Sequence, residues 1–237
     1  MATPEPPLDL PPEVADRMEL TLDLTGRGLH THAEPELRRL LGDFERLLGP
    51  LHPETIGLYD ALGHTLYQLE RLSEAEAMHR EALSRSRRAF GPDDPGTLAY
   101  THNLGAALSM AGRTEEGVTL LADARERRVR ALGPDHSDTL QTGAALGSIL
   151  YSVGETARGL AILEEVYGRC ETHFGRDDEL TLAVCSDLVA ALCSSGRRRE
   201  AYTMLSVLLQ DYERLLGPDD VTTLQTRQRL LRMGFGL

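Results

Sequence analysis

The chain has 237 residues, a formal charge of −12 and an isoelectric point near 5.1, so a nucleic-acid backbone would be repelled overall. All 25 basic residues are arginine, and the absence of lysine excludes P-loop NTPases, Schiff-base enzymes and kinases that depend on a strand lysine. No apolar run approaches the roughly eighteen residues of a membrane span, and the N-terminus does not have the pattern of a signal peptide. We expect a cytoplasmic protein that binds neither a membrane nor nucleic acid.

Residues 1–12 form a proline-rich segment, and a repeat organises the remainder of the chain. The sequence Leu-Gly-Pro, or a near copy, recurs in steps of 42 residues without an insertion. The repeated glycines are Gly49, Gly91, Gly133, Gly175 and Gly217, and the threonines that follow them at a constant distance are Thr55, Thr97, Thr139, Thr181 and Thr223. A fixed period of this length indicates a repeat architecture.

Each period contains two helical patterns. After Thr97, apolar residues recur at helical spacing until the pattern breaks at Gly112. A second run, Thr114 to Leu132, ends at Gly133, a typical C-terminal cap, and Pro134 cannot continue the helix. Each period is therefore a helix hairpin.

Helix starts are also indicated. Asp94 before Pro95 predicts an N-cap for a first helix, and the paired acidic residues that recur in this turn are interpreted as capping groups rather than as a calcium site. Thr31 and Ser73, each followed three residues later by glutamate, predict capping boxes for second helices.

The hairpins divide the chain into consecutive units. We predict a degenerate first repeat at 13–54, full repeats at 55–96, 97–138, 139–180 and 181–222, and a closing helix at 223–237. This gives about eleven helices in one solenoid spanning 13–237, with no second domain.

Small residues recur where two helices of a hairpin must approach each other. Gly63, Gly105 and Gly147 follow a leucine in the first helix, and Ala75 and Gly117 match in the second helix. This Leu-Gly and Ala pattern resembles the tetratricopeptide family, and the 42-residue form ending in LGPDHSDT resembles the repeats of kinesin light chains and of many bacterial repeat proteins. HEAT and armadillo repeats fit the pattern less well, and the absence of tryptophan and of strand alternation excludes a WD40 propeller.

The resemblance implies an all-α, right-handed superhelical solenoid whose first helices line a concave groove. Residues that flank the Leu-Gly pair are then the candidates for binding a partner protein or peptide. They are Asp60, His64, Tyr67, His102, Asn103, Ala106, Met110, Ala144, Ser148, Tyr151, Ser186, Asp187, Ala190, Ser194, Arg229 and Arg232. Asn103 lies where kinesin-type repeats carry an asparagine that contacts peptide backbone, but the other repeats lack it. Small groove residues also have a purely structural explanation, because they let a superhelix curve tightly.

We found no catalytic motif, and we expect no enzyme, cofactor or metal. His30 and His32 are interpreted as solvated turn residues, and Cys185 and Cys193 as small residues of the core. Arginines at 125, 127, 128 and 130 are interpreted as a solvated outer face with ion pairs to the next repeat.

The leading hypothesis is an adaptor that holds a partner segment in the groove. Self-assembly into a homo-oligomer, through the groove or the closing helix, is the second hypothesis. The third is a small-molecule sensor or an enzyme that uses Asp60, His64 and His102.

Overall fold

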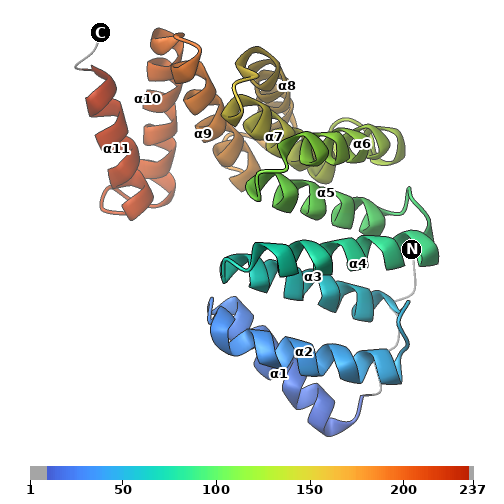
Figure 1. Ribbon diagram of the computed structural model, residues 1–237. Coiled ribbons are helices and arrows are strands. Elements are labelled where there is room, and N and C mark those ends of the chain that lie inside the picture. The colour runs from blue at the N-terminus through green and yellow to red at the C-terminus, as the bar shows by residue number, and fades with distance from the viewer. Residues whose placement is uncertain (1–9, 235–237) are drawn as a thin grey trace. The chain divides into compact units, whose positions relative to one another are not determined.

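The structure is a computed structural model that describes residues 10–234, and within this range every regular element is an α-helix. The eleven helices are α1 (Pro12–Gly26), α2 (His30–Leu47), α3 (Pro53–Gln68), α4 (Leu72–Phe90), α5 (Pro95–Met110), α6 (Thr114–Leu132), α7 (Ser137–Ser152), α8 (Thr156–Phe174), α9 (Glu179–Ser194), α10 (Arg198–Leu215) and α11 (Val221–Gly234) (Figure 1). The predicted all-α fold and helix count are confirmed. The first nine residues of the proline-rich segment and the last three residues of the closing helix lie outside the described range. Among the described helices, none has the length and apolar character needed to span a bilayer.

The helices pack as sequential hairpins in two compact units, and the boundary between them in the sequence falls within α5. In unit 1, up to Ala107, α1 packs on α2, α2 on α3, and α3 on α4. In unit 2, from Leu108, each helix from α6 to α10 packs on the next one in the chain, up to α11. The odd-numbered helices are the first helices of the hairpins, and the even-numbered ones are the second helices.

The first helices other than α1 begin at side-chain caps, whereas α1 begins after Pro11 without one. The Asp94 and Asp178 carboxylates each accept a hydrogen bond, at 3.1 Å, from the backbone N–H three residues ahead. Asp220 accepts from the N–H groups of the two threonines that follow Val221. In α3 and α7 a histidine replaces the aspartate, and Nδ1 of His52 and His136 accepts the bond instead. The recurrent acidic turn is therefore a capping device.

Second helices do not start at capping boxes, and this prediction was wrong. The N-cap of α2 is Leu29 and that of α4 is Arg71, and neither makes a side-chain capping bond. The preceding turn contains a left-handed residue, with φ of 68° at Gly28 and 59° at Glu70. This turn leads directly into the helix, so Thr31 and Ser73 already lie in its first turn.

A glycine closes the second helices. Gly91, Gly133 and Gly175 are the C-caps of α4, α6 and α8, with φ between 84° and 94°. A side chain at this φ would be strained, so the Leu-Gly element of the repeat is a helix stop. The C-terminal cap predicted at Gly133 is confirmed.

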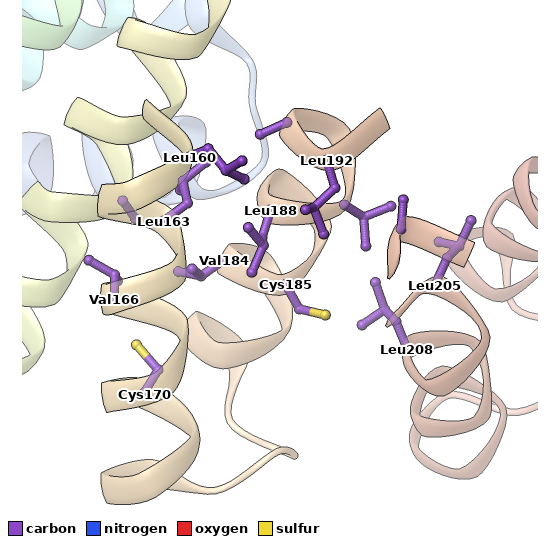
Figure 2. Packing of buried hydrophobic residues seen from close by; sticks show 14 of the residues in the cluster. Leu160, Leu163, Val166, Cys170, Val184, Cys185, Leu188, Leu192, Leu205 and Leu208 are labelled. Carbon is purple, nitrogen blue, oxygen red and sulfur yellow. The ribbon is translucent and has the colours of Figure 1, made fainter. Parts of the chain in front are cut away.

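The core of unit 2 is a continuous layer of leucine, valine, alanine and cysteine contributed by α7, α8, α9 and α10 (Figure 2). Cys170 and Cys185 are buried in this layer, and burial raises the pKa of Cys170 to about 11 and that of Cys185 to about 12. Cys193 is half-buried, with its Sγ 3.9 Å from Sδ of Met233. All three thiols are free, and Cys185 has the predicted role of a small core residue.

The predicted outer arginine face is correct only in part, because Arg125 and Arg127 are half-exposed, Arg128 is buried, and only Arg130 is fully exposed. Arg125 pairs with Glu165 of the next hairpin at 2.9 Å, and Arg130 pairs with Glu126. Arg128, however, is only 3% exposed. Its Nη1 donates to the Asp138 carbonyl oxygen at 2.8 Å and to Thr142 Oγ1 at 2.5 Å. Burial lowers the pKa of this guanidinium, which joins α6 to the first turn of α7.

Candidate functional site

The candidate site is the side of the first helices that carries the predicted groove residues, and we call it the first-helix face. In α7 it consists of Ser137, Gln141, Ala144, Ser148 and Tyr151, whose spacing of three and four residues places them on one side of the helix. The corresponding residues of α9 are Glu179, Ala183, Ser186, Ala190 and Cys193. Asp187 and Ser194 border this row in α9.

A cleft of about 440 Å³ opens where the N-terminal turns of α7 and α9 lie next to each other. Its lining residues are Ser137, Asp138, Gln141, Asp178, Glu179, Leu180 and Ala183. Three of these residues are acidic and none is basic. The carboxylate of Asp178 already caps α9, whereas Glu179 and Ala183 are exposed. The cleft therefore presents an acidic surface to a ligand.

Sequence reasoning missed this cleft because it considered only residues near the Leu-Gly pair. The repeat itself carries the missing signal. Gln141 and Ala183 are one period apart and belong to the same helical rows as Ala144 and Ser186, respectively. Extending each predicted row by one turn toward the helix start leads to the cleft.

Further along the face, hydrogen bonds between polar side chains connect α7 to α9. Ser148 Oγ donates to Asp187 Oδ2 at 2.6 Å, and the hydroxyl groups of Tyr151 and Ser194 lie 3.2 Å apart. Four predicted residues are therefore brought together in two pairs. Ser186 and Ala190 are half-exposed beside them, while Ala144 is buried in the core.

The remaining predicted residues of unit 2 are not part of these pairs. Met110 is exposed at the C-terminal end of α5. Arg229 is half-exposed and Arg232 is exposed, both on α11.

In unit 1 the predicted residues meet around a buried histidine. Asp60 Oδ1 lies 2.7 Å from His79 Nδ1, and Asp60 Oδ2 accepts a hydrogen bond of 2.7 Å from Nδ2 of Asn103. His79 belongs to α4 and is only 4% exposed. The Asp60 carboxylate thus joins α3 to both α4 and α5. Its partners include His79 and Asn103, neither of which belongs to the Asp60, His64 and His102 set of the sensor or enzyme hypothesis.

His79 was not predicted as a site residue, although the period marks it as unusual. The other repeats carry leucine in its place, at Leu37, Leu121, Leu163 and Leu205, and all four are buried. A Cβ atom at Gly63 would lie 2.8 Å from the His79 ring, so the glycine of α3 makes room for the imidazole.

The other predicted residues of unit 1 lie around this network. Tyr67 is half-buried against the core of the unit, and His102 and Ala106 are half-exposed. His64 is exposed, and its ring stands edge-on to that of His30 with 6.2 Å between centroids. His30 is half-buried as the first residue of α2, which corrects its interpretation as a solvated turn residue.

A second cleft of unit 2, about 400 Å³ in volume, lies between α8 and α10 on the opposite side of α9. Cys185, Leu188, Leu192 and Met204 contribute apolar surface. At its rim Arg197 forms ion pairs of 2.6 Å with both Glu164 and Glu200. These pairs join consecutive second helices and are part of the packing of the array.

Eleven helices in sequential hairpins with a 42-residue period define a helical repeat protein. Family models described as tetratricopeptide repeats match residues 56–116 in one case and residues 97–138 and 181–221 in another. These matches together cover more than half of the chain. The chain is a tetratricopeptide repeat protein.

Solved structures show the same fold. A putative kinesin light chain from Podosopora anserina with nearly identical TPR-like repeats is 19% identical, with a TM-score of 0.72 over 87% of this chain and 98% of that one. BtubC (BKLC) from P. vanneervenii is 19% identical, with a TM-score of 0.73 over 86% and 81% of the two chains. A Rap protein complexed with Competence and Sporulation Factor is 12% identical, with a TM-score of 0.70 over 94% and 65%. No curated protein sequence matches the chain.

Proposed function

We propose that the chain is an adaptor that binds an extended, basic segment of a partner protein along the first-helix face. Tetratricopeptide repeats typically serve as protein-interaction modules, and the structurally similar Rap protein is complexed with Competence and Sporulation Factor. The observation that carries the proposal is the cleft between α7 and α9, which continues the row of predicted groove residues.

The charge of the cleft indicates the character of the segment. Its ionisable lining residues are Asp138, Asp178 and Glu179, and Asp187 extends the acidic surface along α9. A bound arginine or lysine would be attracted to these carboxylates, and the attraction would weaken as salt screens it. Exposed Glu179 offers a carboxylate at the cleft, while the half-buried Tyr151 offers rigid contact area further along.

Unit 1 contributes differently. Asn103 already donates one amide hydrogen to Asp60, so a peptide would meet a preformed Asp60–Asn103 pair rather than a free amide. Exposed His64 and half-buried Tyr67 add contact surface on the same helix as Asp60.

The test is selection of peptides from a random display library on the purified chain, followed by affinity measurements in solution. We expect the selected peptides to be enriched in arginine and lysine. The double variant Glu179→Arg/Ala183→Arg should weaken their binding about a hundredfold, because it fills the cleft and cancels its negative charge. Salt should weaken binding to the unmodified chain.

The matched control is Thr203→Arg, which places the same side chain at the second cleft on the other side of α9. Binding should be unchanged in this variant. Peptides that keep their affinity for the Glu179→Arg/Ala183→Arg variant, or that lose it with Thr203→Arg, would show that the first-helix face is not the binding surface. The triple variant Tyr67→Ala/Asn103→Ala/Tyr151→Ala tests the remainder of the face, with helicity as its folding control.

A further inference from the structure

Helix α11 carries an exposed apolar stripe. Leu224 is 45% exposed and Leu231 is 59% exposed, and their spacing of seven residues places them on one side of the helix. Most of the same positions in earlier periods are buried, although Leu182, one period before Leu224, is only partly buried. Ile56, Leu98 and Leu140 match Leu224, and Val189 matches Leu231; each is at most 2% exposed.

The repeat shows what normally covers this stripe. Gly63 and Gly147 occupy the position of Leu231 in α3 and α7, and each faces the second helix that follows it. A Cβ atom at Gly63 would meet His79 of α4, and one at Gly147 would meet Leu163 of α8. No second helix follows α11 within residues 10–234. The stripe therefore lies where a second helix packs in the earlier hairpins, and no helix of the described residues covers it.

The charge of α11 indicates which kind of helix would pack on its apolar stripe. It carries three arginines and no acidic residue, in a chain whose net charge is −12. Arg227 pairs with Glu213 of its own chain at 2.7 Å and lies beside the stripe. Arg232 is exposed on the other side of the stripe. A complementary helix would present an apolar residue among carboxylates.

Helix α1 has this character. Leu20 is 47% exposed, although its counterparts Leu62, Leu104, Leu146 and Leu188 are at most 5% exposed. The helix contains four carboxylates and one arginine. Glu13, Asp16 and Asp23 share one side of the helix with Leu20, at spacings of seven, four and three residues.

We infer that α11 of one molecule packs on α1 of a second copy, so that the chains associate head to tail. Each helix then covers an apolar residue that its own array leaves exposed, and the arginines of α11 meet the carboxylates of α1. The symmetric alternatives bring like charges together, arginines in an α11 pair and carboxylates in an α1 pair. A pocket of about 190 Å³ beside Leu231, between α10 and α11, provides space for the incoming Leu20.

A contact between two different surfaces leaves one of each free on every dimer. Association therefore continues into longer assemblies unless the rotation closes a ring. This property distinguishes the proposed contact from a two-fold dimer. The contact does not involve the cleft between α7 and α9, so the Glu179→Arg/Ala183→Arg variant should assemble as the unmodified chain does.

The test is sedimentation velocity of the full chain over a range of protein and salt concentrations. We expect assemblies that grow with protein concentration and dissociate as salt is raised. Leu20→Arg, and separately Leu224→Asp/Leu231→Asp, should each weaken association by about tenfold or more, because they place like charges at the contact. A monomer at all concentrations, or assembly that both variants leave unchanged, would overturn the inference.

Two further measurements make the result specific. An equimolar mixture of the two variants should form a one-to-one dimer and nothing larger, since one variant retains α1 and the other retains α11. The control substitution Leu22→Arg changes an exposed leucine, 64% exposed, on another side of α1 and should leave assembly intact. A mixture that stays monomeric, or a loss of assembly with Leu22→Arg, would contradict the α1–α11 contact.

Discussion

The α3–α4 hairpin of unit 1 and the α7–α8 hairpin of unit 2 use the same glycine position for different packing. Gly63 faces a histidine ring, which is held by the Asp60 carboxylate. Gly147, two periods later, faces Leu163 and the backbone of Gly159. One hairpin therefore buries a polar pair, and the other brings two backbones together.

The difference shows that the repeat determines where the two helices of a hairpin contact each other, but does not determine which side chains pack at that contact. Leucine at the His79 position is the common solution in this chain, since four other repeats have it. The α3–α4 hairpin replaces that leucine with an imidazole that needs a partner. The stability of the α3–α4 hairpin therefore depends on the Asp60 carboxylate, which is part of the candidate site. The stability of the α7–α8 hairpin depends instead on Gly147 and Gly159 having no side chain.

The largest expected effect is that of Gly159→Ala in α8. The added Cβ would lie 2.5 Å from the Gly147 carbonyl oxygen and 2.6 Å from the Tyr151 backbone nitrogen, so the two helices must separate. We expect a loss of about 2–4 kcal/mol in the free energy of unfolding, measured by urea denaturation. Gly168→Ala, on the same helix with open space around it, should be neutral or stabilise by up to about 1 kcal/mol. Equal effects of the two changes would refute the close backbone contact.

Removing the carboxylate of unit 1 should have the next largest effect. Asp60→Ala leaves buried His79 without its 2.7 Å partner and should destabilise by about 1–3 kcal/mol. His79→Leu restores the residue of the other repeats, so the double variant should be more stable than Asp60→Ala alone. Asp187→Ala, which removes an exposed carboxylate from unit 2, is the control. If the changes in the free energy of unfolding caused by Asp60→Ala and His79→Leu simply add in the double variant, then Asp60 and His79 are not coupled.

These two predictions show what the sequence allows and what it does not. The hairpins, the capping glycines and the aspartate caps were predictable because each depends on residues close together in the chain. Three features depend on contacts between helices: the burial of Arg128, the His79–Asp60 pair and the cleft at Gln141. Periodicity does not give the burial of Arg128, whereas the histidine in place of a repeated leucine marks the His79–Asp60 pair and the extended helical rows lead to the cleft.

The false capping boxes have a different cause. The pattern of threonine or serine followed by glutamate was present, but the left-handed turn before the second helix already determines where the helix starts. At α4 the glutamate of the predicted box, Glu76, points to its own helix instead and accepts a hydrogen bond of 2.8 Å from Arg80 Nε.

The turn before α4 gives a smaller, stabilising prediction. Glu70 is left-handed, with φ of 59°, whereas the other hairpins have glycine at this position. Glu70→Gly should stabilise the chain by about 1 kcal/mol, because glycine adopts this backbone conformation without strain. Gly154→Ala, the reverse change in the α7–α8 hairpin, should destabilise by a similar amount. Thermal unfolding measures the change in stability of both variants. A loss of stability with Glu70→Gly would contradict the argument that Glu70 is strained.

The smallest expected change is local and concerns the thiols, which all belong to unit 2. Burial raises the pKa of Cys185 to about 12, so its native thiol is protonated at pH 8 and resists iodoacetamide, while half-buried Cys193 reacts. The raised pKa also affects stability: the contribution of the Cys185 thiol to the free energy of unfolding is lost as the pH rises above 9.0, the ordinary pKa of a thiol.

The two hairpins can be compared by alkylation. Mass spectrometry of each cysteine should show that Gly159→Ala speeds modification of Cys185 and that Asp60→Ala does not. Equal acceleration by both would mean that the two hairpins open together.

The uninterrupted period has a consequence for how such a chain changes over generations. Every repeat ends with a glycine stop and continues into a turn of the same length, so any two of these junctions are interchangeable. A recombination event between two copies would remove or duplicate one whole hairpin and still join a helix end to a proper turn. The protein can therefore gain or lose binding surface one whole hairpin at a time, by recombination within its own gene. Lineages that carry it should differ in the number of repeats more readily than in the length of a repeat.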